Sequence, residues 1–133
     1  MLSVDKKNIL TSVASVPLDP AVGIQIARLW QDPDKSYYAT SIMPGKRIAA
    51  HYHNEGDELY VVIGGSGFMR LGTPVSTGVE WEQEFEVQSG DFFTVAPKMV
   101  HQLVNTSKDE NLVALFGCVE DHMGADRFVI QEQ

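Results

Sequence analysis

Apolar and polar residues alternate along most of this chain in short runs. The clearest run is Glu80–Val87, in which Trp81, Gln83, Phe85 and Val87 alternate with four glutamates. Because successive side chains of a β-strand point to opposite faces, this run predicts a strand with one buried and one solvated face. Apolar residues at helical spacing are hard to follow anywhere in the chain, so the pattern predicts an all-β protein.

Eight further runs show the same alternation, which brings the prediction to about nine short strands. Glycine, proline, asparagine and aspartate separate the runs, as at Asn54–Asp57 and Gly72–Gly78. Many short strands at close intervals favour a β-sandwich or a small barrel, which leaves few exposed sheet edges. The eight runs are Gly23–Trp30, Tyr37–Met43, Ile48–His53, Glu58–Ile63, Phe68–Leu71, Phe92–Val95, His101–Asn105 and Leu112–Val119.

The length of the chain corresponds to one domain, since 133 residues is close to the usual size of a single compact domain. We expect an N-terminal arm over residues 1–21, a barrel over 22–119 and a C-terminal tail over 120–133. Hydrophobic residues make up 44% of the chain and charged residues 21%, which predicts a packed core.

The charge of the chain argues against two classes of partner. Ten basic against eighteen acidic residues give a net charge of −8, which would repel nucleic acid and anionic membrane surfaces.

No apolar run approaches the roughly 20 residues needed to span a bilayer. A single cysteine, Cys118, cannot form an intrachain disulfide, so we expect a cytoplasmic protein in which Cys118 is a small buried hydrophobic residue.

Three histidines and one glutamate are candidate metal ligands. His51 and His53 are two residues apart in a predicted strand, so their side chains point from the same face. A tight turn would then place Glu58 beside them on the next strand, and His101 could complete the set if the sheet closes into a barrel. Such a set suits Fe(II), Mn(II), Ni(II), Cu(II) or Zn(II), and an octahedral ion would keep two open positions.

The spacing of these residues resembles the first motif of the cupin superfamily. Gly45 is followed by five residues, His51, one residue, His53, four residues, Glu58, six residues and Gly65. In the family's second motif, a glycine, a histidine and an asparagine match Gly90, His101 and Asn105 at the family's distances. The chain departs from that motif in two places, because Pro97 lies one position late and Lys98 stands where a second glycine is expected.

The resemblance implies a conical β-barrel of the jelly-roll, or double-stranded β-helix, type and commonly a homodimer. It also implies one divalent transition metal per chain at the barrel centre, with Fe, Mn or Ni ahead of Cu or Zn. The metal ligands would be the residues that match the motifs, His51, His53, Glu58 and His101.

The expected function is that of a metalloenzyme acting on a small polar substrate with a carbonyl or enol group. A dioxygenase is favoured narrowly over an isomerase, decarboxylase or lyase, and Glu58 is also the candidate catalytic residue. The main alternative is a non-catalytic module that binds or senses a small ligand through the metal. A metal-free sugar-nucleotide isomerase of the same superfamily is a weaker alternative, because the full ligand set is present.

Other side chains receive predictions from strand parity and from their neighbours. Tyr60 and Val62 share the parity of Glu58, and Leu103 shares that of His101, so these three are expected to line the substrate pocket. His122 is expected to be a solvated loop residue, and Arg70 a solvent-facing strand residue ahead of an inward-pointing one.

Overall fold

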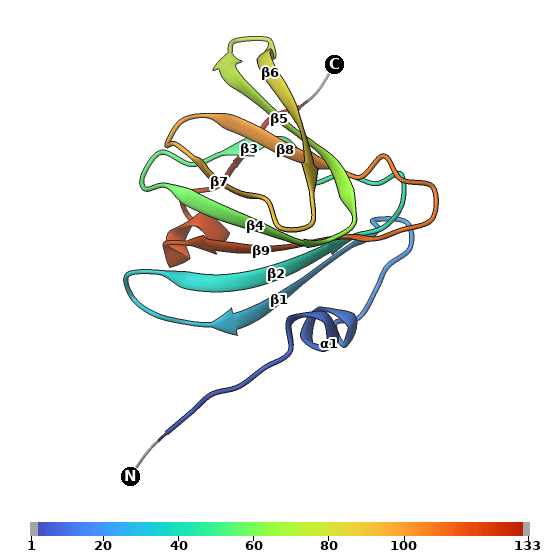
Figure 1. Cartoon of the computed structure of the whole chain (residues 1–133). Coiled ribbons are helices and arrows are strands. Elements are labelled where there is room, and N and C mark those ends of the chain that lie inside the picture. Colours follow the sequence, from blue (N-terminus) through green and yellow to red (C-terminus); the bar gives the residue numbers. More distant parts are fainter. Residues whose placement is uncertain (1–2, 132–133) are drawn as a thin grey trace.

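The computed structural model describes residues 3–131, and most of them lie in two antiparallel sheets. One sheet has the order β1-β2-β9-β4-β7 and the other the order β10-β3-β8-β5-β6. The sheets face each other and curl into a small barrel (Figure 1). The strands are β1 Ile24–Trp30, β2 Ser36–Ile42, β3 His51–Tyr52, β4 Glu58–Gly64, β5 Ser66–Val75, β6 Gly78–Gln88, β7 Phe92–Val95, β8 Val100–Val104, β9 Leu112–Cys118 and β10 Phe128–Val129.

The all-β prediction is confirmed, and each of the nine predicted strands corresponds to an observed one. The predicted turn at Gly72–Gly78 is wrong in extent, because β5 continues to Val75 and β6 begins at Gly78. The four glutamates of β6 face solvent as expected, while Val87 is buried. Alternation thus located the strands, but it did not show how far the β5–β6 hairpin extends.

The barrel interior holds the main hydrophobic core, to which both sheets contribute. Ile42, Met69 and Leu112 are completely buried there. Cys118 is also buried, as expected, and burial followed by the negative charge of Glu58 raises the pKa of its thiol to about 12. The thiol is therefore protonated at neutral pH and behaves as a packing group.

The N-terminal arm contains a helix, α1 (Ile9–Ala14), which the alternation analysis did not predict. The helix begins after Asn8, whose side chain accepts a hydrogen bond from the backbone N–H of Thr11. Its buried Val13 packs with Ala27 and Ala39 on the outer surface of the β1-β2-β9 part of the sheet. Figure 1 shows α1 lying against β1 and β2 outside the barrel.

The C-terminal segment adds to the barrel beyond the boundary at residue 119 expected from the sequence. A 3₁₀ helix, η1 (Glu120–Met123), follows β9, and β10 then pairs with β3. The Tyr38 hydroxyl donates to the Glu120 carboxylate at 2.8 Å, and Arg28 forms an ion pair with the same carboxylate. These contacts fasten η1 to the β1–β2 edge and bring the segment across the end of the barrel.

The turn before β8 forms despite the departures from the second family motif. Lys98 has a φ of +68°, the only positive φ outside glycine among residues 3–131. Its backbone N–H donates to the His53 carbonyl at 2.6 Å. A side chain with a Cβ atom pays about 1 kcal/mol in this left-handed region, which explains why glycine is expected at this position.

Replacing Lys98 should therefore change stability according to backbone conformation. We expect Lys98→Gly to raise the free energy of unfolding by about 1 kcal/mol in urea denaturation, because glycine removes the Cβ strain. Lys98→Ala is the matched control, since it removes the same exposed side chain and keeps the strain. A Lys98→Gly variant no more stable than Lys98→Ala would contradict strain at this turn.

Candidate metal centre

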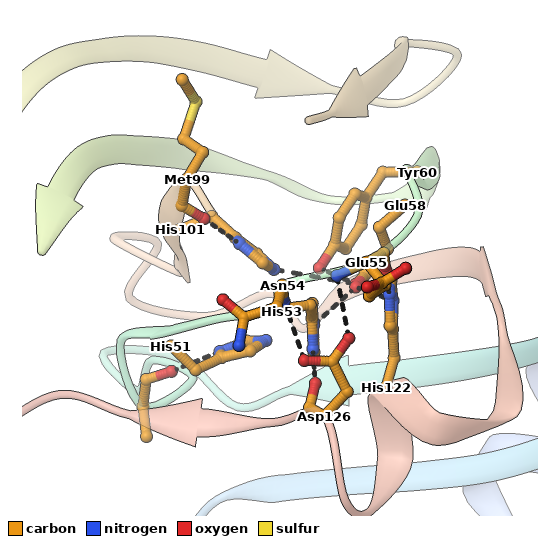
Figure 2. Close-up of polar contacts among 11 residues, drawn as sticks. His51, His53, Asn54, Glu55, Glu58, Tyr60, Met99, His101, His122 and Asp126 are labelled. Carbon is orange, nitrogen blue, oxygen red and sulfur yellow. Dashed lines mark hydrogen bonds and ion pairs between the residues drawn. The ribbon is translucent and has the colours of Figure 1, made fainter. Parts of the chain in front are cut away.

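The four predicted ligands converge at one end of the barrel interior. His51 on β3 is the direct register partner of His101 on β8, and their ring centroids lie 4.2 Å apart. His53 follows β3, and Glu58 is the first residue of β4. The hairpin expected between these two segments is wrong, because β3 and β4 lie in different sheets and Glu58 reaches the histidines across the barrel. One donor atom from each residue can be chosen so that all four lie within 4.8 Å of one another. Figure 2 shows these side chains directed toward a common point.

Each of the three rings is oriented by its Nδ1–H group. The Nδ1–H group of His51 donates to the Ala49 carbonyl at 2.8 Å, and that of His101 donates to the Met99 carbonyl at 3.1 Å. Each acceptor lies two residues earlier in the chain. That of His53 donates to the Asp126 carbonyl of the C-terminal segment at 2.6 Å. Because a carbonyl can only accept, each ring carries its proton on Nδ1 and directs an Nε2 lone pair inward.

The inward-facing nitrogens are the observation that tests the fit of a metal. Nε2 of His53 and Nε2 of His101 are buried and have no hydrogen-bond partner among residues 3–131. The Nε2 atom of His53 lies 2.9 Å from Oε2 of Glu58, close to the separation of about 3.0 Å between neighbouring ligands of an octahedral ion with bonds of about 2.1 Å. A divalent cation would accept both nitrogen lone pairs and balance the carboxylate charge, so His51, His53, Glu58 and His101 fit a metal ion.

Glu58 is ionised at the centre of this cluster. Burial alone raises the pKa of its carboxyl, but the imidazoles of His101, His122 and His53 outweigh burial and hold the pKa well below its usual value. Oε1 also accepts a hydrogen bond from the Tyr60 hydroxyl. Burial is the largest cause that raises the pKa of Tyr60 well above its usual value, and the negative charge of Glu58 is the next. The proton of Tyr60 therefore stays on the hydroxyl.

His51 is held in the neutral form that metal binding requires. Burial is the largest cause, followed by repulsion from His101, and together with smaller contributions they lower its pKa to about 3. The positive charge of Arg127 is one of those smaller contributions. His51 is therefore an unprotonated donor throughout the physiological pH range.

His122 is not the solvated loop residue that its sequence neighbours suggested. Its side chain on η1 is 1% exposed and stacks on the His53 ring, with centroids 3.9 Å apart and planes 3° apart. Nε2–H donates to the Glu55 carbonyl, and Nδ1 lies 3.4 Å from Oε2 of Glu58. Burial lowers the pKa of His122, but the nearby Glu58 carboxylate and Glu55 carbonyl outweigh burial and raise it. His122 thus lies beside Oε2 of Glu58, whereas Tyr60 donates to Oε1, and Nδ1 of His122 has no hydrogen-bond partner among residues 3–131.

Asp126 fixes the segment that carries these contacts. Its carboxylate accepts hydrogen bonds from the backbone N–H groups of Asn54 at 2.7 Å and Glu55 at 3.0 Å. Those two residues form the turn between His53 and Glu58, so one side chain ties the C-terminal segment to the loop between two ligands (Figure 2). Composition gave no signal for this connection, because the tail and the loop are distant in the chain.

A cavity of about 50 Å³ adjoins the histidine–glutamate cluster, as we call His51, His53, Glu58 and His101. All three predicted pocket residues belong to the hydrophobic core, and of these Tyr60 and Leu103 line the cavity whereas Val62 does not. The lining residues are Ile26, Thr40, Ile48, His51, His53, Glu58, Tyr60, His101, Leu103, Phe116, His122, Met123 and Arg127. Apolar side chains, the histidine–glutamate cluster and the basic side chain of Arg127 therefore line one small cavity.

Arg70 is absent from that cavity and lies on the outer surface, as expected. Its guanidinium stacks over the Trp81 ring at 4.0 Å from the centroid and donates to Oε1 of Gln102 at 3.0 Å. The contacts run across β5, β6 and β8 and stabilise the sheet surface.

An antiparallel barrel that encloses three histidines and a glutamate defines a class, the double-stranded β-helix proteins with an internal metal-ligand set. A model of the cupin domain matches residues 39–117, more than half of the chain, so this chain belongs to the cupin family. A search of curated proteins finds no match. No helix in the part of the chain that the structure describes is long and apolar enough to cross a membrane.

Solved structures support the fold. A conserved protein with a double-stranded β-helix domain from Klebsiella pneumoniae has 17% identity and a TM-score of 0.74, over 98% of this chain and 100% of that one. KdgF from Halomonas sp. has 21% identity and a TM-score of 0.61, over 80% and 87%. An oxalate decarboxylase has 21% identity and a TM-score of 0.64, over 80% of this chain and 28% of that one. These likenesses show a shared fold.

Removal of the first two histidines should remove the metal. We expect the purified protein to contain about one first-row transition ion per chain by elemental analysis, and the His51→Ala, His53→Ala double variant to contain none, because two of four ligands are lost. Tyr52→Phe is the matched control, because Tyr52 lies between the two histidines and stacks on Phe128 instead. Undiminished metal in the double variant would contradict the assignment.

Proposed function

We propose that this cupin is a metalloenzyme that binds one divalent first-row transition ion and transforms a small polar molecule with a carbonyl or enol oxygen. The observation that carries the proposal is the set of inward-facing imidazole nitrogens beside an ionised glutamate, at the wall of a cavity. A bound ion supplies Lewis acidity and, if it is Fe or Mn, redox chemistry with dioxygen.

The protein side chains have separate roles in this proposal. His51, His53 and His101 are neutral ligands whose orientation is set by backbone carbonyls. Tyr60 donates a hydrogen bond to Oε1 of Glu58 and His122 lies beside Oε2, so these two neighbours restrict the orientation of that carboxylate. Its lowered pKa makes Glu58 a weak base, so we assign it to metal binding ahead of proton transfer.

The walls of the cavity favour a reaction that excludes bulk water. Ile26, Leu103 and Phe116 present apolar surface to the space beside the cluster. Such surroundings strengthen electrostatic interactions and protect reactive species from side reactions. We therefore keep a dioxygenase ahead of an isomerase, decarboxylase or lyase. The homodimer stays a prediction.

A substrate panel tests whether the site is catalytic. We expect Fe- or Mn-loaded protein to consume oxygen with at least one compound among small diketones, 2-oxo acids and thiols, and the His51→Ala, His53→Ala variant to lose that activity. Oxygen electrode traces, with NMR of the products to detect isomerisation or decarboxylation, provide the measurement. A metal-loaded protein that binds these compounds and changes none of them would contradict catalysis and favour the ligand-binding module.

A further inference from the structure

The wall of the cavity contains a buried hydroxyl without a partner. Thr40 lies on β2 and is 3% exposed, and its Oγ1 has no hydrogen-bond partner among residues 3–131. Its register neighbours are Ile26 on β1 and Ala114 on β9, neither of which has a polar side chain. Because a buried polar group without a partner is costly, the hydroxyl beside this cavity points to a polar group of a ligand.

The same cavity is lined by one basic side chain that forms no ion pair within the described chain. Arg127 is exposed, and its guanidinium forms no hydrogen bond and no ion pair with residues 3–131. Its backbone is nevertheless fixed, because Asp126 is tied to the Asn54–Glu55 turn and Phe128 pairs with Tyr52. A cation held at this place in a chain of net charge −8 indicates an anionic ligand.

The size and charge of the site narrow that anion. A cavity of about 50 Å³ has room for about four water-sized groups, which corresponds to a molecule of two or three carbons with its oxygens. One guanidinium balances one negative charge, and its planar fork matches the two oxygens of a carboxylate. The apolar walls suit the short carbon chain of a carboxylate, which a phosphate ion lacks.

We propose that the substrate is a small monocarboxylate with a carbonyl or hydroxyl oxygen on the adjacent carbon. Arg127 and the Thr40 hydroxyl hold the carboxylate, and the adjacent oxygen faces the histidine–glutamate cluster. The orientation of that second oxygen rests on the proposed function of the metal centre, whereas recognition of the carboxylate rests on Thr40 and Arg127 alone. Both residues determine specificity in this scheme and neither is a metal ligand.

Calorimetric titration with pyruvate, and with its uncharged analogue pyruvamide, tests the carboxylate end. We expect the wild type to bind pyruvate at least tenfold more tightly than pyruvamide, and Arg127→Gln to lose about tenfold for pyruvate alone. Lys108→Gln is the control, because it removes an equal charge from an exposed position that does not line the cavity. Equal affinity for the two compounds, or unchanged pyruvate binding in Arg127→Gln, would overturn the inference.

The Thr40 contribution has its own pair of variants. Thr40→Val keeps the shape and removes the hydroxyl, so it should weaken pyruvate binding about fivefold, while Thr40→Ser keeps the hydroxyl and should bind as the wild type does. Circular dichroism and metal content of each variant report whether the fold and the metal centre are intact. Equal binding by folded Thr40→Val and Thr40→Ser would remove Thr40 from the site. If Thr40→Val does not fold, weak pyruvate binding by folded Thr40→Ser would contradict the assignment of the contact to the hydroxyl.

Zinc-loaded and metal-stripped samples separate this inference from the proposed function. Pyruvate binding that depends on Arg127 in a protein that binds no metal would support carboxylate recognition and contradict the metalloenzyme. A protein that binds metal but neither prefers pyruvate to pyruvamide nor responds to Arg127→Gln would leave the metal centre standing and overturn carboxylate recognition. Tighter binding of inorganic phosphate than of pyruvate would also overturn it.

Discussion

The cost of burying polar groups is the constraint on which the site depends. Three imidazoles and a carboxylate lie together in the barrel, where each unpaired polar atom is expensive. Backbone carbonyls accept from Nδ1 of every histidine in the cluster, which leaves the Nε2 atoms facing inward toward Glu58. A cation at their meeting point compensates the remaining lone pairs and the negative charge, so the polar interior and the metal chemistry have the same physical origin.

The barrel supplies this arrangement through strand pairing and through its last residues. Pairing of β3 with β8 sets His51 against His101, although they are fifty residues apart in the chain. The C-terminal segment then closes the site, since it provides the carbonyl for His53, the His122 side chain beside Glu58 and the Arg127 side chain at the cavity. The fold therefore places ligand orientation and substrate recognition on one segment after the last long strand.

The sequence predicted those parts of the structure that follow from local periodicity. Alternation located nine strands, but the hairpin expected to set Glu58 beside His51 and His53 does not form, and it is the closing of the two sheets into a barrel that brings these donors together. The position of His101 required the family resemblance, because strand parity says nothing about which distant strands pair. Val62 shares the parity of Glu58 and is buried in the core but does not line the cavity, so parity predicted its inward direction and not its distance from the site.

Of the elements that the sequence analysis did not predict, α1 and η1 were missed for identifiable reasons. Ile9, Val13 and Val16 have the spacing of one helical face after the capping residue Asn8, a signal too short to stand out in an alternating chain. His122 lies among polar residues and small turn residues, and only the fold of η1 across the barrel end brings it to Glu58. Burial of a side chain by a distant segment leaves no trace in its immediate sequence neighbours.

X-ray absorption spectroscopy on protein reconstituted with one transition ion tests the central claim most directly. The account predicts a first shell of three imidazole nitrogens and one carboxylate oxygen at about 2.0–2.2 Å, completed by solvent oxygens. A shell without imidazole scattering, or one that stays the same when His51 and His53 are replaced, would contradict a metal centre at this point in the barrel.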